Sequence, residues 1–375
     1  MTKRVKRWFE MSTAKNKLNM LGRIWSNYSF IFVFFIIFLV YAMTNSSLSW
    51  SATMNIFRHS AVIGISALGM GLVCITGEID LSAGSMLAFV SGFSVVIFNK
   101  TGGNIPATLL FALIMGAGLG LVNGVLVGVV KMPSFIVTLA TMLIYRSLAQ
   151  YYCQHIPKAL IGGGSSVYKM TSDIAGYDSM YGFGNGKIAT LPIVGVVLIL
   201  LTMLFVYITN DTKFGKKIYA IGSCEKGAFM AGINVRLMKM MVFVIMGIMI
   251  GAASFLWICM NGSSDPATTG ASYEMYAIAA VVLGGVSMSG GRGKIIGVLF
   301  GSLSYTVIDK IIIALKMDSL INDAIKGVIL ILVILVQVAG PQLKERFGKR
   351  LGMAKAPEAK DFVSDTSQRT DTTVS

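Results

Sequence analysis

Ten apolar runs, separated by more polar connections, constrain the fold of this chain more than any other feature of its sequence. They lie near residues 28–43, 57–77, 81–98, 105–129, 133–152, 190–209, 239–260, 274–289, 294–314 and 321–340. Hydrophobic residues make up 55% of the 375 residues and charged residues only 13%, which leaves too little polar surface to cover a soluble globule. The sequence therefore predicts an all-α polytopic protein of about ten transmembrane segments in a lipid bilayer.

The cations of the connections predict the orientation of these segments. If the basic residues 1–27 are cytoplasmic, every second connection is cytoplasmic as well, and those connections hold most of the lysines and arginines. The outward connection 153–189 carries only three lysines, and the outward connection 261–273 carries no cation. This is the positive-inside distribution, so both termini are predicted to be cytoplasmic. A cleaved signal peptide is the alternative for the first run, although no small-residue cleavage site closes it cleanly.

The same pattern divides the chain into three parts. Residues 1–27 are a basic N-terminus, residues 28–340 a transmembrane domain with a cytoplasmic loop at 210–238, and residues 341–375 a polar tail predicted to be disordered. Several runs are shorter than the roughly 20 residues of a full span, so some helices are expected to be broken or re-entrant. On the fourth run, glycines recur at the four-residue spacing of closely packed helices.

Cofactor chemistry is not predicted. None of the four Gly-Lys pairs is followed by Ser or Thr, so the chain lacks a phosphate-binding loop of its own. The four cysteines show no CxxC spacing and the two histidines lie far from them, which argues against a metal site. The net charge of +15 follows the predicted topology, and no nucleic-acid partner is expected.

The stretch TGEIDLSAGS, residues 76–85, places two carboxylates between apolar runs. Each would cost roughly 2.5 to 3.5 kcal/mol at the centre of a lipid-facing helix. A break between two helices avoids that cost, with Gly77 ending the first helix in a left-handed conformation and Asp80 or Ser82 capping the second. Gating and substrate contact are the alternative roles for the two acids, and Glu78 has no role in the break.

The cytoplasmic loop contains a second distinctive stretch, EKGAFMAG, among basic residues. Residues 223–231 are predicted to form a short helix that is capped by Ser223 and ended by Gly232. Such a helix at the membrane face could dock into another protein. The alternative is a solvated connector whose lysines only set the topology.

Four stretches together resemble the permease subunits of bacterial ABC importers for simple sugars, of the ribose, xylose and galactoside type. They are TGEIDLSAGS, NGVLVGVVKMPSFIVTLATMLIYRSLA, YAIGSCEKGAFMAGINV and YEMYAIAAVVLGGVSMSGGRGKIIGVLFG. They follow in the family's order, and the resemblance extends from about residue 55 to about residue 335. It identifies the family better than it identifies the substrate.

The resemblance implies a multi-pass protein of the bacterial inner membrane that forms the path for a monosaccharide or a sugar-like solute. Its partners would be a second permease copy or a homologous permease, two ATP-binding subunits and an extracytoplasmic solute-binding protein. ATP hydrolysis would belong to the partner, so the chain itself is predicted not to be an enzyme and to hold no cofactor. The helix-break signature in this chain consists of Gly77, Asp80, Ser82 and Gly84.

In the same family the cytoplasmic loop would touch the ATPase. The coupling residues in this chain would be Ser223, Ala228, Gly232 and Ile233. Cys224 and Gly227 depart from the family's usual Asn and Ala, and Glu78 occupies a position that is often Gly.

Neutral sugars need hydrogen-bond partners without fixed charge, and polar residues of the broken and neighbouring helices are candidates for the solute path. They are Asn123, Thr138 and Thr141. The alternative function is an ion-coupled secondary transporter in which Glu78 and Asp80 form the ion site.

Overall fold

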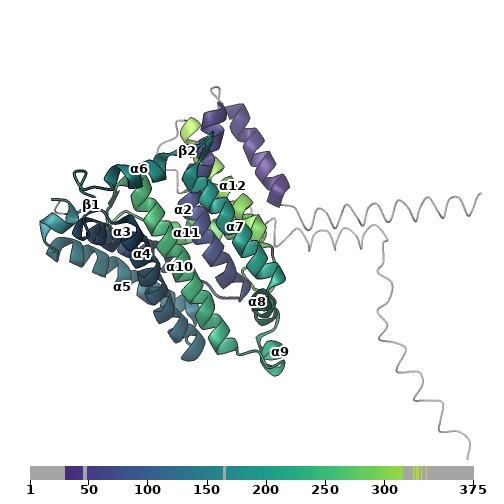
Figure 1. Cartoon of the computed structure of the whole chain (residues 1–375). Helices are drawn as coiled ribbons and strands as arrows, with labels where there is room; N and C mark the ends of the chain where they lie inside the picture. Colours follow the sequence, from purple (N-terminus) through teal and green to yellow (C-terminus); the bar gives the residue numbers. More distant parts are fainter. Residues whose placement is uncertain are drawn as a thin grey trace, which may run out of the picture. The chain divides into compact units, whose positions relative to one another are not determined.

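The structure is a computed structural model, and it describes residues 30–44, 49–163 and 166–315 together with residues 324, 325, 327, 328, 331 and 335 (Figure 1). The chain divides into two compact units, Met1–Lys326 and Gly327–Ser375, and every element named below belongs to the first. The predicted N-terminus 1–27, the tail 341–375 and most of the tenth run lie outside the described residues. The predicted cytoplasmic position of the two termini lies outside them as well.

Each of the first nine apolar runs forms a helix. The first is the helix Phe30–Thr44. The next four are α2 (Trp50–Ile75), α3 (Ala83–Lys100), α4 (Ile105–Gly124), which continues as the π-helix η1 (Val125–Val129), and α5 (Ser134–His155). The last four are α7 (Ile193–Asp211), α10 (Val235–Asn261), α11 (Tyr273–Leu283) and α12 (Ile295–Ala314).

The connections contain elements that the apolar runs did not predict. The long outward connection holds the short 3₁₀-helix η2 (Lys158–Ile161) and the helix α6 (Tyr177–Asn185), and the cytoplasmic loop holds α8 (Lys213–Ser223) and α9 (Glu225–Met230). Four two-residue strands form two antiparallel pairs, β1 (Tyr168–Lys169) with β4 (Ser263–Ser264) and β2 (Lys187–Ile188) with β3 (Leu191–Pro192). The described fold is therefore mostly helical, with small strand pairs that fasten the loops.

Six of the described helices are long and apolar enough to cross a membrane. They are α2, α3, α4 with η1, α7, α10 and α12. The helix Phe30–Thr44 and α11 are shorter, and α5 is not among the six although it has 22 residues. The structure supports a polytopic helical membrane protein, and the number of ten segments stays a prediction.

The centre of the first unit consists of α2 and α10. Helix α10 packs against α2, α3 and α4, and α2 packs in turn against α7, α11 and α12. At the crossing of α4 and α10, a Cβ atom on Gly116 or Gly120 would collide with backbone of α10. The glycine spacing of the fourth run thus serves close helix packing, as its sequence predicted.

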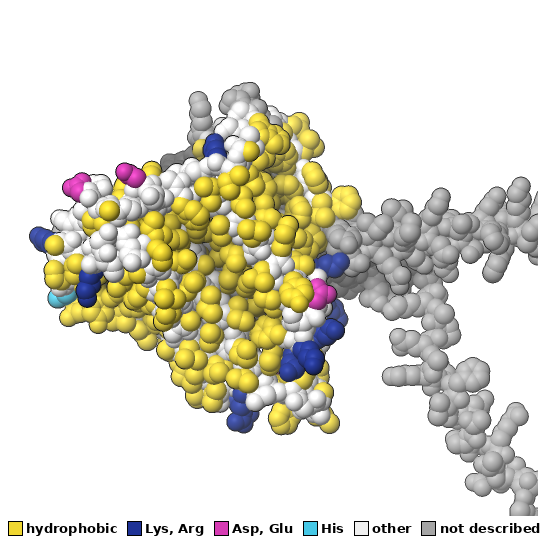
Figure 2. Space-filling view, viewed as in Figure 1, with side chains coloured by type: hydrophobic (Ala, Val, Ile, Leu, Met, Phe, Trp, Pro, Cys, Tyr) yellow, Lys and Arg dark blue, Asp and Glu magenta, His cyan; other side chains and the backbone are white. Residues whose placement is uncertain are grey.

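The surface is divided between apolar sides and a charged end. In Figure 2 hydrophobic side chains cover most of the visible face, and Lys and Arg side chains gather toward the end where α8 and α9 lie. This end is the one that the positive-inside distribution predicts to be cytoplasmic.

Candidate functional site

The stretch TGEIDLSAGS forms a break between α2 and α3. Helix α2 ends at Ile75, and Gly77 follows in the left-handed region with φ of 82°. Asp80 Oδ1 accepts hydrogen bonds from the backbone N–H of Ser82 at 2.8 Å and from the Ser82 hydroxyl at 2.6 Å. Ser82 occupies the N-cap position of α3, but its side chain accepts no bond from a backbone amide of the helix, so Asp80 supplies the accepting oxygen of the junction.

Two of the three candidate path residues bond to this break. Asn123 Nδ2 donates to Ser82 Oγ at 2.8 Å, and Thr138 Oγ1 donates to the carbonyl of Ile79 at 3.5 Å. Thr141 lies about one turn further along α5 and donates to the carbonyl of Thr138. All three side chains are buried in the single chain. Asn123 therefore stabilises the break through Ser82. Thr138 contacts it at Ile79, although its hydroxyl lies closer to the Ser134 carbonyl at 2.8 Å, and Thr141 bonds within α5.

The first turn of α3 contacts the connection between α10 and α11. A Cβ atom on Gly84 would collide with the carbonyl of Gly270 and with Glu274 Oε2, so only glycine allows this approach. The connection is held from α5 as well, because Arg146 Nη1 donates to the carbonyls of Pro266 at 3.0 Å and Thr269 at 2.6 Å. The break is thus in direct contact with a connection that the sequence places on the outward side.

The short helix of the cytoplasmic loop begins two residues later than predicted. Ser223 does not cap it, because α8 continues through Ser223 and leaves that residue helical. Cys224 is the N-cap: its backbone is extended, and its Sγ accepts a hydrogen bond from the N–H of Gly227 at 3.3 Å. Gly232 follows the helix with φ of 79°, which is the left-handed conformation expected of it.

The residues of α9 point in two directions. Ala228 is buried, and its carbonyl accepts from the N–H of Ile233 at 3.1 Å, while the Ile233 side chain packs partly against the hydrophobic core. Phe229 and Met230 are 71% and 86% exposed. Two of the predicted coupling residues therefore anchor α9 to the permease, and the outward apolar surface comes from residues that the sequence reasoning missed. The sequence does contain a feature that indicates this surface, because Phe229 and Met230 are two adjacent large apolar residues within a basic loop.

Glu78 has a partner that the sequence did not reveal. Its Oε1 lies 2.6 Å from Lys239 Nζ in the second turn of α10, and the same ammonium lies 2.9 Å from Glu225 Oε2 at the start of α9. Glu78 and Lys239 are 161 residues apart, and no local pattern pairs them. Glu78 thus bonds to Lys239 whereas Asp80 bonds to Ser82, so the two acids of the break have separate partners.

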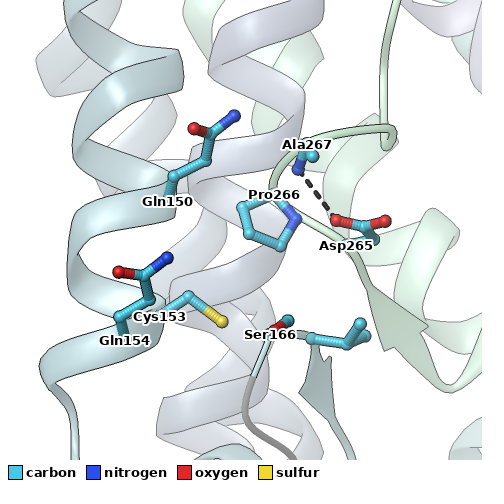
Figure 3. A pocket seen from close by; sticks show the side chains of 8 residues that line it. Gln150, Cys153, Gln154, Ser166, Asp265, Pro266 and Ala267 are labelled. Carbon is cyan, nitrogen blue, oxygen red and sulfur yellow. Dashed lines mark hydrogen bonds between the residues drawn. The ribbon is translucent and has the colours of Figure 1, made fainter.

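A cavity of about 310 Å³ lies beside the C-terminal end of α5, which the sequence predicts to face outward (Figure 3). Helix α5 forms one wall and the segment Asp265–Ala267 the opposite one. Its lining residues are Gln150, Cys153, Gln154, Ser166, Val167, Asp265, Pro266 and Ala267. Asp265 is engaged within its own segment, with Oδ1 accepting from Ala267 N and Oδ2 from the Thr268 hydroxyl. The side-chain amides of the two glutamines are therefore the main uncharged hydrogen-bonding groups of the cavity.

A bundle of long apolar helices with a break inside it and a charged end is typical of a polytopic helical membrane protein. Residues 52–334 match the family described as "Branched-chain amino acid transport system / permease component". The ribose import permease protein RbsC of Bacillus subtilis (strain 168) is 32% identical over 330 residues, covering 87% of this chain and 97% of that protein. RbsC of Escherichia coli (strain K12) is 31% identical over 308 residues, covering 82% of this chain and 92% of that protein.

The xylose transport system permease protein XylH of Haemophilus influenzae is 28% identical over 348 residues, covering 80% of this chain and 92% of the relative. No solved structure matches the chain. The chain belongs to the family of bacterial ABC importer permeases that includes these ribose and xylose permeases. The family resemblance and the multi-pass position in the inner membrane that the sequence predicted are both confirmed.

Proposed function

We propose that this chain forms the translocation path of an ABC importer for a monosaccharide or a sugar-like solute, driven by ATP hydrolysis on a separate subunit. Family membership supports the transport class, and the names of the ribose and xylose relatives support the class of solute. The full importer would contain a second permease copy or a homologous permease, two ATP-binding subunits and an extracytoplasmic solute-binding protein.

The observation that carries this proposal is the exposed apolar tip of α9. Phe229 and Met230 are exposed on a short helix within a basic loop, where no lipid is expected to cover them. Large apolar side chains on a short helix are suited to a pocket of a partner protein, and a few such residues dominate the binding energy of an interface. The ATP-binding subunit is the partner that the family supplies on this side of the membrane.

The test is co-purification of the ATP-binding subunit with the permease from membranes that contain both. The double variant Phe229→Ala/Met230→Ala should lower the amount of co-purified subunit by about tenfold or more, because losing hot-spot contacts costs about 2 kcal/mol or more. Ala228 is less suitable for this test, since it is buried and its replacement would disturb α9 itself.

The matched control is Lys216→Ala/Lys217→Ala, which truncates two exposed side chains of the neighbouring helix α8. Wild-type co-purification of the α9 variant would contradict the docking assignment. Uptake that is driven by an ion gradient and is independent of any ATP-binding subunit would instead support the secondary transporter.

For the solute we assign two successive environments. The cavity beside α5 would receive the solute, because Gln150 and Gln154 offer hydrogen bonds without fixed charge. Asn123, Thr138 and Thr141 would contact it later, since they are buried around the break and become accessible only when the break rearranges.

A further inference from the structure

One ammonium group joins the break to the docking helix. Lys239 Nζ binds Glu78 in the break and Glu225, the first residue of α9. The Lys239 and Glu78 side chains are 11% and 16% exposed, whereas the Glu225 side chain is 58% exposed. The ion pair with Glu78 is therefore largely shielded from solvent. The ion pair with Glu225 is open to solvent on the Glu225 side and contributes little free energy, as is usual for exposed ion pairs.

Backbone contacts also hold the end of α2, just before the break, against α8 and against the connection between α11 and α12. The N–H of Gly291 donates to the carbonyl of Ile75, the last residue of α2, at 2.9 Å. A Cβ atom on Gly222, near the end of α8, would collide with that same carbonyl. The last turn of α8 therefore rests on the last turn of α2. Helix α9 follows α8 directly, so a large displacement of α9 would also move α8 and strain its contact with the end of α2, just before the break.

From Glu78 the contacts continue into α5. The next residue, Ile79, has both of its backbone polar groups bonded to that helix. Its N–H donates to Ser134 Oγ at 3.3 Å, and its carbonyl accepts from Thr138 Oγ1 at 3.5 Å. A displacement that reaches Glu78 is thus passed through these two long hydrogen bonds to the helix whose C-terminal end lines the cavity. Packed and hydrogen-bonded chains of this kind carry coupling between distant sites.

We propose that Lys239 is a positioning residue that transmits the displacement of α9 to the break between α2 and α3 through its ion pairs with Glu225 and Glu78. This rests on the proposed function, in which the ATP-binding subunit moves α9. Glu225 moves with α9 and draws the Lys239 ammonium with it. The ion pair between Lys239 and Glu78 then displaces Glu78, and the neighbouring Ile79 passes this displacement to α5. Lys239 binds neither solute nor nucleotide and affects transport only through these partners.

The experiment uses the complete importer, reconstituted in liposomes with its ATP-binding subunits and its solute-binding protein, with ribose and xylose as the solute probes. Lys239→Met keeps an unbranched side chain that is one atom shorter and removes the charge. It should co-purify with the ATP-binding subunit within about twofold of wild type. Solute taken up per ATP hydrolysed should fall by at least about fivefold, because coupling between sites is typically worth about 5- to 150-fold.

Two further variants separate this role from a purely structural one. Lys217→Met removes an exposed cation of α8, outside the docking helix, and should leave uptake per ATP unchanged. The triple swap Glu78→Lys/Lys239→Glu/Glu225→Lys rebuilds both ion pairs with reversed charges and should recover uptake per ATP to within about threefold of wild type. A structural role would alter the yield and the melting temperature of the permease but not the ratio of uptake to hydrolysis.

The outcomes distinguish this inference from the function on which it rests. Normal uptake per ATP in a Lys239→Met importer that assembles would overturn the relay and leave the proposed function intact. Failure of the wild-type permease to bind an ATP-binding subunit would overturn both. If Lys239→Met does not fold, Glu225→Gln takes its place, because that side chain is largely exposed, and unchanged uptake per ATP in it would equally overturn the relay.

Discussion

Helices α3 and α4 are neighbours along the chain, yet they meet different surroundings. Within their most apolar stretches, 78% of the residues of α3 are buried in the described fold and only 33% of those of α4. The less buried helix is the more apolar one. In water this order would be reversed, but lipid tails are as apolar as leucine, so the most hydrophobic helices can lie at the outside. Hydrophobicity here predicts that a helix spans the membrane, and it does not predict how much protein covers it.

Helix α4 is therefore held in the bundle by the close fit of its backbone against α10, and not by its hydrophobicity. One side of the helix carries glycines that meet α10, and the other side carries exposed Leu110 and Ile114. Helix α3 is held differently, by buried hydroxyl and carboxylate groups at its start. The following variants test these two ways of holding a helix, from the largest expected effect to the smallest.

The largest effect is expected at the crossing of α4 and α10. Gly247→Val would drive a branched side chain into the backbone of Gly116 and push the helices apart. Overpacking of this kind should cost about 3 kcal/mol, measured by unfolding in detergent and by the yield of folded protein. Gly118→Val is the control on α4, since a Cβ atom there meets nothing within 4 Å. Equal stability of the two variants would show that the glycine contact does not hold α4.

A smaller loss is expected at the start of α3. Asp80→Leu removes the acceptor of the Ser82 N–H and hydroxyl, so the buried N–H loses its partner and the hydroxyl keeps only the weak acceptor Met86 Sδ. This should lower stability by about 2 kcal/mol and reduce the amount of folded protein in the membrane. Asp80→Asn keeps an accepting oxygen and should retain most uptake. Complete loss of uptake in a normally expressed Asn variant would mean that the charge of Asp80 acts in the mechanism.

The smallest effect is expected on the lipid-facing side of α7. Leu200 is 59% exposed in the described fold, so Leu200→Ala should change the free energy of unfolding by less than about 0.5 kcal/mol. Leu198, two residues earlier, is fully buried, and Leu198→Ala should cost about 2 kcal/mol or more. Comparable losses in the two variants would place a protein partner, and not lipid, against Leu200.

Local features of the sequence predicted much of this architecture. Nine apolar runs form helices because the length and polarity of a run are properties of the run itself. Gly77 adopts the left-handed conformation expected of it, whereas Asp80 accepts from the N–H of Ser82, just before α3, and not from an amide within the helix as capping would require. The start of α9 was predicted wrongly at Ser223, because both α8 and the residues after it are compatible with a helix, and tertiary packing decides where the first one ends.

Contacts between distant parts of the chain could not be predicted in this way. The role of Glu78 depends on Lys239, which lies 161 residues away in another helix. Asn123 and Thr138 were chosen for their uncharged polarity, but polarity alone does not say whether a side chain faces a solute path or the backbone of another segment. The cavity beside α5 was not predicted for the same reason, since its walls come from α5 and from a connection more than 100 residues later.

The cap of α9 also has a practical use. Three of the four cysteines are buried and Cys224 is exposed, so a thiol reagent should attach to the natural protein at a single position. Alkylation turns the thiol into a thioether, whose sulfur still accepts a weak hydrogen bond, so the turn before α9 can survive the reaction. A fluorophore or spin label placed there would sit where nucleotide-dependent motion is expected to begin, and the permease could be followed through its transport cycle without a cysteine-free background.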